Sequence, residues 1–167
     1  MIKQGLLGEF LHEAENTRKL LNMVPDSALD YRPQPHLWSV AELASHIAAI
    51  YGWYSGTFNV DEFDFATYHY EREDFSKAAN IVRKFEENVA KAQKAIEDSD
   101  ESTYFNDWIL KAGGQIFIGP MPKMSAIRGF LYNHLYHHRG ELVAHLRATG
   151  NKVPGLYGPA YEASQGK

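Results

Sequence analysis

Apolar residues recur every three or four positions along four long stretches of this 167-residue chain: residues 6–23, 39–56, 74–96 and 123–148. This spacing is close to the 3.6-residue period of an α-helix and gathers apolar side chains on one helical face. A helix with one apolar face has to bury it, and four such helices can do so against one another. The sequence therefore predicts an all-α four-helix bundle, formed as a single domain by residues 1–167.

Local signals mark several helix boundaries. Ser39 followed by Glu42 is a capping-box pattern, in which two side chains accept backbone N–H groups at the start of a helix. Asp74 is the expected N-cap of the third helix. Gly150 follows the fourth helix at the position where glycine commonly ends one.

Two connections do not fit a simple bundle. Residues 57–73 are irregular, aromatic and acidic, and residues 103–123 lose the helical period. In the second connection, Ala112-Gly113-Gly114 separates two short apolar runs, so a short hairpin near residues 105–118 competes with an ordered loop. Connections of this length can cross the bundle, which leaves its topology open.

The fourth predicted helix carries a cluster of histidines: His134, His137, His138 and His145. At about 100° per residue, His134 and His138 lie one turn apart on the face that also carries the apolar residues. Two buried imidazoles this close cannot both be protonated cheaply, but both can be neutral and direct lone pairs at one ion. The alternative is a pair of core histidines that form hydrogen bonds with tyrosines and carbonyls.

A third histidine strengthens the metal interpretation. His46 lies among Leu43, Ile50 and Trp53 on the apolar face of the second predicted helix. Three inward histidines on two helices predict a site with coordination positions left for water or substrate, which is the catalytic rather than the closed structural pattern. Imidazole ligands suit one divalent transition metal ion, with zinc or nickel foremost and iron, manganese or copper as alternatives.

Glu141 is the nearest candidate to assist this site. It falls on the same side of the helix as His138, where it can orient an imidazole N–H, act as a general base or ligate the ion. The alternative is a surface carboxylate paired with a lysine or arginine. His145 is a spare ligand candidate, about 10 Å from His138 along the helix axis. Other polar residues are expected to be structural or to lie on the surface: His12, His36, His69, Asn133 and Arg139.

Composition narrows the function further. The chain has no cysteine, which excludes disulfides, thiolate ligands and a cysteine nucleophile and fits a reducing cytoplasm. The formal net charge is −4 and there is no basic tract, so we expect no nucleic-acid partner. Neither a membrane span nor a signal peptide is predicted. A cytoplasmic protein that acts on a small molecule is expected.

Several motifs, taken in order, resemble the DinB-like superfamily of damage-inducible and bacillithiol-transferase-like metal-binding four-helix bundles. Arg32-Pro33-Gln34-Pro35 followed by residues 38–48 is similar to the start of the second helix in that family. Residues 119–121 ahead of residues 134–142 are similar to its H-x3-H-R-G-Q signature. Residues 153–159 are similar to its ending.

The resemblance implies an up-down-down-up bundle with long crossovers, a divalent metal ion held by His46, His134 and His138, and a homodimer. One position departs from the pattern, because the family usually has glutamine where this chain has Glu141. A carboxylate there would raise metal affinity or supply a base. Characterised relatives include thiol-dependent S-transferases and a thiol-dependent isomerase, but a shared fold does not supply a substrate.

Three functions remain open at this point. In a metal-dependent thiol S-transferase or hydrolase, the ion would lower the pKa of a low-molecular-weight thiol cosubstrate or a water. Aromatic segments at residues 53–65 and 108–117 would then bind an apolar electrophile, unless they only pack the core. A non-catalytic, dimeric stress-response module would instead have a fourth protein ligand, from Glu141 or His145, and no pocket. The third function is a metal-free bundle with core histidines.

Overall fold

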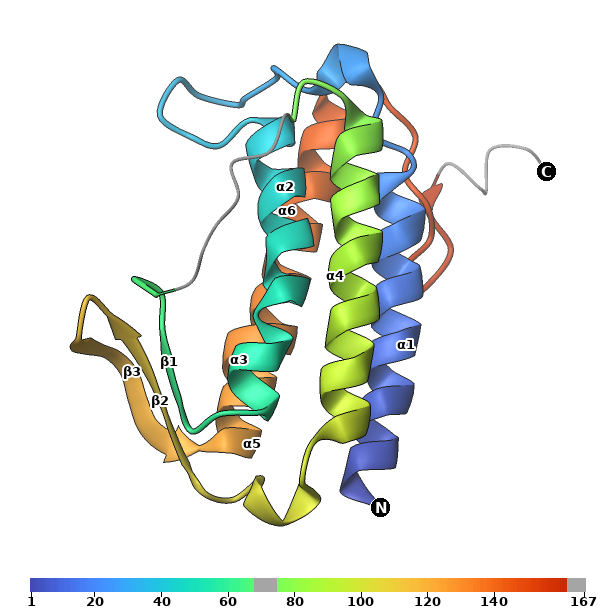
Figure 1. The fold of residues 1–167 in the computed structure, drawn as a ribbon. Coiled ribbons are helices and arrows are strands. Elements are labelled where there is room, and N and C mark those ends of the chain that lie inside the picture. Colours follow the sequence, from blue (N-terminus) through green and yellow to red (C-terminus); the bar gives the residue numbers. More distant parts are fainter. Residues whose placement is uncertain (68–74, 162–167) are drawn as a thin grey trace.

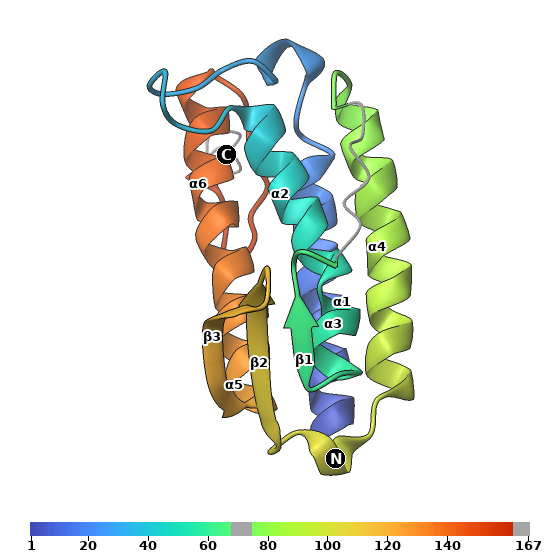
Figure 2. The same cartoon turned by 60° about the vertical axis from the view of Figure 1, so that its left-hand side comes forward.

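The computed structural model describes residues 1–67 and 75–161. Within these residues it contains four long helices and a three-stranded mixed sheet, which lies against one side of the bundle (Figure 1, Figure 2). The predicted all-α fold is therefore wrong. The sheet is built from the two connections in which the helical period is lost.

The bundle consists of α1 (Ile2–Leu21), α2 (Val40–Gly52), α4 (Ala78–Asp98) and α6 (His134–Ala148). In Figure 1, α1 and α6 run upward, whereas α2 and α4 run downward. α2 contacts both α4 and α6, so α2 and α6 are antiparallel neighbours. None of the described helices combines the length and apolar character needed to cross a bilayer.

The predicted apolar faces form the core. Phe10 of α1, Ile50 of α2, Phe85 of α4 and Leu142 of α6 are all fully buried. The spacing of three and four residues therefore identified the packed faces of these helices correctly.

Short helices occupy the connections between the long ones: η1 (Asp26–Ala28), α3 (Tyr54–Phe58) and η2 (Glu101–Thr103).

The sheet has the order β1-β2-β3, with β1 (Glu62–Asp64), β2 (Asp107–Ala112) and β3 (Gln115–Pro122). β1 pairs with β2 in parallel, so the chain passes through all of α4 between these two strands. A three-residue strand has no readable alternation, and its partner lies beyond a whole helix. For this reason β1 was not predicted.

β2 and β3 form a hairpin, which settles the choice between a hairpin and an ordered loop at residues 105–118. Gly113 and Gly114 have φ values of 63° and 80°, and a two-residue hairpin turn of type I′ needs positive values at both positions. Trp108 of β2 is fully buried, whereas Phe117 of β3 is 70% exposed. β2 therefore anchors the sheet to the bundle, and β3 is its outer strand.

The capping box at the start of α2 is confirmed. Ser39 Oγ accepts the Glu42 N–H at 3.2 Å, and Glu42 Oε2 accepts the Ser39 N–H at 2.6 Å. α4 begins only at Ala78, and Asp74 lies outside the described residues. Asp26 of η1 instead accepts the Ala78 N–H at 2.9 Å, so the cap of α4 comes from a residue distant in sequence.

The helix predicted over residues 123–148 is continuous but not uniform. α5 (Lys123–Ala126) leads into a π-helical segment, η3 (Ile127–Asn133), which leads into α6. Gly150, with φ of 75°, follows α6 as predicted. π-helical turns are rare in proteins, and those that occur often lie at functional sites. η3 ends directly before His134.

Candidate metal centre

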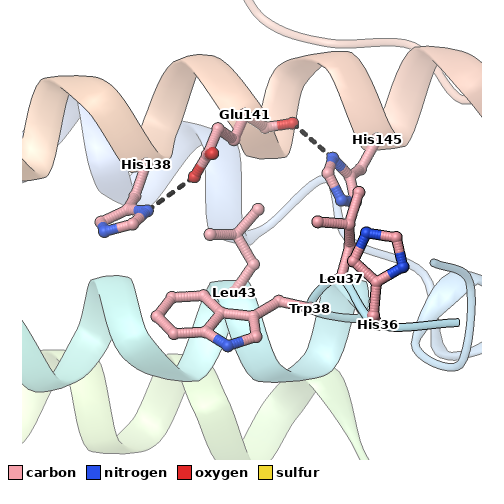
Figure 3. A pocket seen from close by; sticks show the side chains of 7 residues that line it. All are labelled: His36, Leu37, Trp38, Leu43, His138, Glu141 and His145. Atoms are coloured by element: carbon pink, nitrogen blue, oxygen red, sulfur yellow. Dashed lines mark hydrogen bonds and ion pairs between the residues drawn. The ribbon is translucent and has the colours of Figure 1, made fainter. Parts of the chain in front are cut away.

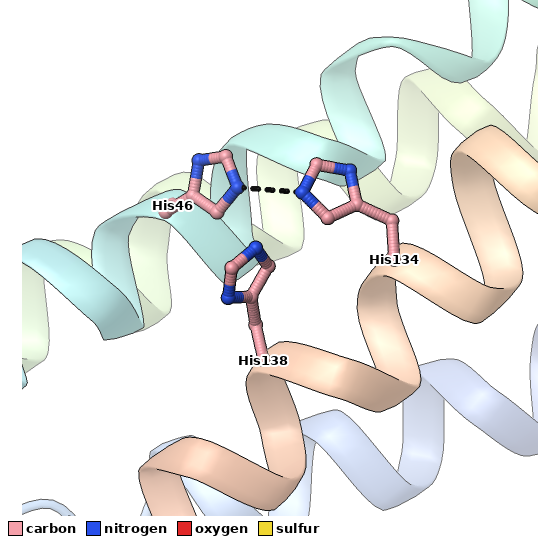
Figure 4. A group of neighbouring side chains, drawn as sticks. All are labelled: His46, His134 and His138. Atoms are coloured by element: carbon pink, nitrogen blue, oxygen red, sulfur yellow. Dashed lines mark hydrogen bonds between the residues drawn. The ribbon is translucent and has the colours of Figure 1, made fainter.

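Three histidines meet where α2 and α6 lie side by side (Figure 4). One ring nitrogen from each of His46, His134 and His138 lies within 4.8 Å of the other two. The Nε2 atoms of His46 and His134 are 3.1 Å apart. The three residues selected from the sequence are therefore brought together, and we call them the histidine trio.

Burial holds two members of the trio neutral. Burial, together with the neighbouring His138 and His134, lowers the pKa of His46 to about 3. Burial and the nearby His138 also lower the pKa of His134, while a hydrogen bond with the Phe130 backbone opposes part of that shift. At neutral pH both imidazoles therefore keep a lone pair available for a cation.

Glu141 contacts His138 at Nδ1 (Figure 3), the ring nitrogen that lies farther from His46 and His134 (Figure 4). Its Oε2 atom lies 2.7 Å from His138 Nδ1, and its Oε1 atom lies 3.4 Å from His137 Nε2. A carboxylate at Nδ1 favours the tautomer with its hydrogen there, which leaves Nε2 of His138 as an acceptor toward the trio. Among the roles expected for Glu141, this geometry supports the orientation of an imidazole.

His137, His138 and Glu141 form a second group whose potential ligand atoms lie within 4.8 Å of one another. This group shares His138 with the trio, and the Glu141 carboxylate already contacts His138 Nδ1. His137 and Glu141 are 65% and 42% exposed. Water can therefore hydrate both of them, and the more buried trio is the stronger candidate for a metal site.

Two tryptophans enclose the trio. The Trp38 ring stacks on His138 with 5.4 Å between centroids and meets His46 edge-on at 4.7 Å. The Trp53 ring lies 5.5 Å from His46 and 5.6 Å from His134. Trp53 belongs to the aromatic segment at residues 53–65 that was expected to bind an electrophile, and it follows His46 by two helical turns. Trp38 had not been selected as a site residue, because it lies in the loop before α2, where no period applies.

Each member of the trio borders a different pocket. His138 lines a cavity of about 290 Å³, His134 one of about 380 Å³ and His46 one of about 300 Å³. Trp38 lines the first and third of these pockets, and Trp53 lines the second and third. The two tryptophans thus act as walls between the pockets that surround the trio.

The remaining candidate histidines lie outside the trio. The Nδ1–H group of His145 donates to the backbone oxygen of Glu141 at 2.8 Å, and His145 lines the His138 pocket together with His36 (Figure 3). His12 is an exposed residue of α1, as expected. His69 lies outside the described residues.

Fold and site together define a class of protein, a four-helix bundle in which two antiparallel helices bring three histidines to one point. The DinB family model matches residues 1–167, and the chain belongs to the DinB family. A relative from Bacillus subtilis (strain 168), named uncharacterized protein YrdA, is 30% identical over 153 residues, which cover 90% of this chain and 84% of that protein.

Two solved structures share the fold. One is a DinB-like protein from Bacillus cereus ATCC 10987, with a TM-score of 0.70, 23% sequence identity, and coverage of 92% of this chain and 97% of that one. The other is the DinB-like protein YjoA from Bacillus subtilis, with a TM-score of 0.71, 17% identity, and coverage of 91% and 97%. At these identities the likeness establishes the fold alone.

Proposed function

We propose that this DinB-family protein binds one divalent transition metal ion through His46, His134 and His138, and that it is a metal-dependent enzyme of the thiol S-transferase or hydrolase type. The observation that carries the proposal is the approach of three ring nitrogens to within 4.8 Å of one another. Zinc and nickel are the leading candidates, because imidazole nitrogen suits both. The proposal includes a homodimer and a small-molecule substrate.

The donor set suits such an ion. Two nitrogens bound at about 2.1 Å lie about 3.4 Å apart at a tetrahedral angle and about 3.0 Å apart at a right angle. The distance of 3.1 Å between the Nε2 atoms of His46 and His134 falls within this range. Two neutral nitrogens this close have to share either a hydrogen or a cation.

A divalent ion at the trio would supply a Lewis acid that lowers the pKa of a thiol or a water at neutral pH. The chain's own groups would prepare the site for it. Glu141 fixes the His138 ring through Nδ1, and its side chain is 42% exposed at the adjoining pocket, where it can accept a proton. Because the chain has no cysteine, a transferred thiol would come from a cosubstrate.

The competing function, a non-catalytic metal-binding module, requires a fourth protein ligand. The carboxylate of Glu141 lies at Nδ1 of His138, the nitrogen that lies farther from His46 and His134 (Figure 4). His145 interacts with a backbone oxygen instead of the trio. Because a pocket borders each of the three histidines, these contacts favour a site with open positions and hence an enzyme.

Metal content of the untagged protein, measured by inductively coupled plasma mass spectrometry, tests the binding step. We expect about one ion per chain in the parent and a loss of that ion in His46→Ala and His138→Ala, because two imidazoles hold such ions far more weakly than three. His145→Ala is the matched control, since this histidine lines the His138 pocket outside the trio. Stoichiometric metal in both trio variants would refute the assignment.

A thiol-consumption assay tests the catalytic step. The metal-loaded parent, given a low-molecular-weight thiol and an apolar electrophile, should consume both, and His138→Ala should not. A series of hydrolysable esters covers the hydrolase alternative. If metal is bound but no turnover is found with either set of substrates, the non-catalytic module becomes the better assignment. Light scattering of the same samples measures the oligomeric state.

A further inference from the structure

The pocket that borders His134 differs from the other two in its apolar walls. On one side, Trp53 and Phe130 stack with 5.2 Å between centroids and an interplanar angle of 9°, and Phe65 lies 5.4 Å from Trp53. The hairpin also lines the pocket, through Phe117 and Ile118. His134 lies at the boundary between this apolar space and the trio.

A glycine keeps the pocket open from the helix side. Gly129 of η3 lines the pocket, and a Cβ atom placed on it would meet no heavy atom within 4 Å. Its backbone does not require glycine, because its φ lies outside the left-handed region. Glycine within a helix costs about 1 kcal/mol relative to alanine. The empty space at this position therefore comes from the missing side chain and not from a backbone constraint.

The outer wall of the pocket is itself incomplete. Phe117 lines the pocket while 70% of its surface is exposed to solvent. An aromatic side chain at the open rim of an apolar cavity can contact a ring that enters the cavity. The cavity, at about 380 Å³, lies within the range of small-molecule sites, which is roughly 300–1,000 Å³.

We infer that this pocket binds an aromatic ring of a small-molecule substrate and places the atom attached to that ring beside His134. The catalytic consequence rests on the proposed function, whereas the binding of the ring does not, because the aromatic and aliphatic residues that line the pocket are not metal ligands. The hairpin and η3 thus select the substrate, and the trio lies at the reacting end.

The probe for this inference is 4-fluorotoluene, a ring with no group that ligates a metal, observed by ¹⁹F NMR with the full-length protein in metal-loaded and chelator-treated forms. We expect saturable binding in both forms. Gly129→Leu fills the pocket from η3 and Ile118→Trp fills it from β3, and each should weaken binding by about 10-fold to 200-fold, the effect of crowding an apolar pocket.

Matched controls separate the pocket from general surface effects. Gly140→Leu places the same side chain on an α6 position where a Cβ atom also meets nothing within 4 Å, away from the pocket. Ile116→Trp places the same ring on β3 at a residue that is 57% exposed and does not line the pocket. Both controls should bind the probe as the parent does.

Three results would overturn the inference. The first is the absence of saturable binding of the probe by the parent, and the second is binding by both filled variants that matches the parent. The third is a fraction of occupied pockets that falls as protein concentration rises, which would assign the surface to contact between copies. Failure of the metal proposal looks different. His46→Ala would then retain its ion, while the probe would still bind the parent and be excluded by Gly129→Leu.

Discussion

His138 and Arg139 are consecutive residues of α6 and both are buried, with 9% and 1% of their surface exposed, but they face different helices. The Arg139 guanidinium points to α1, where it pairs with the Glu13 carboxylate, donates to the Glu13 backbone oxygen at 3.1 Å and contacts the Tyr157 hydroxyl. His138 points to α2 and toward the other two histidines of the trio (Figure 4).

The difference lies in whether the chain itself supplies an opposite charge to a buried polar group. Arg139 has an opposite charge, and the Tyr157 hydroxyl donates to the same Glu13 carboxylate at 2.7 Å, so the charges are balanced within the protein. His46 and His134 offer His138 no opposite charge, and their own Nε2 atoms can share either a hydrogen or a cation. A divalent ion bound from outside would use all three imidazoles, whereas the partners of Arg139 all belong to the chain.

The largest expected effect is on the structural side of this comparison. Arg139→Met leaves the Glu13 carboxylate buried without its cation and should lower the free energy of unfolding by about 3–5 kcal/mol, measured by urea denaturation. The double variant Arg139→Met/Glu13→Leu removes both charges and should recover most of this loss. If the single variant unfolds within about 1 kcal/mol of the parent, Arg139 does not have the structural role assigned to it.

An intermediate effect is expected on the functional side. Glu141→Ala removes the carboxylate from His138 Nδ1 and should weaken metal binding by about 10-fold to 100-fold in a chelator competition. Glu141→Gln retains an acceptor for the same N–H and should weaken it less. His137→Ala is the control, because it removes the other Glu141 contact. An equal loss in His137→Ala would contradict the role of the contact with His138.

The smallest expected effect is a pH dependence of the metal-free protein. The pKa of His46 is about 3 in the folded state and about 6.5 when unfolded, so below pH 6.5 the unfolded chain binds more protons and stability falls as pH falls. His134 acts in the same direction. The urea midpoint should therefore fall from pH 7 to pH 5, and it should fall less in His46→Leu. An equal decrease of the urea midpoint in the parent and in His46→Leu would contradict this account.

Much of the fold follows from short-range patterns. The apolar period located the four long helices, the Ser39–Glu42 pair fixed the start of α2, and two adjacent glycines formed the hairpin turn. The candidate site was accessible for the same reason, because His134 and His138 are one turn apart and His46 shares the apolar face of its helix. Each of these features depends on residues within a few positions of one another.

Other features exist only once distant segments meet. β1 has no pattern of its own and forms because β2 offers it a parallel edge. Asp26, in the connection between α1 and α2, caps α4 at Ala78 although the two residues are 52 positions apart. Trp38 lies on the trio because the loop before α2 folds back over α6. The pocket at His134 needs both the hairpin and the π-helical turn of η3.

The sequence by itself thus determined which residues are helical, which faces are apolar and which histidines point inward, since these are properties of local geometry. Only the tertiary structure decided that Glu141 orients His138 without joining the trio, that Arg139 pairs with Glu13 of α1, and that an apolar pocket adjoins His134. The physical reason is that hydrogen-bond partners and cavities are set by the packing between segments, which the period within any one segment does not encode.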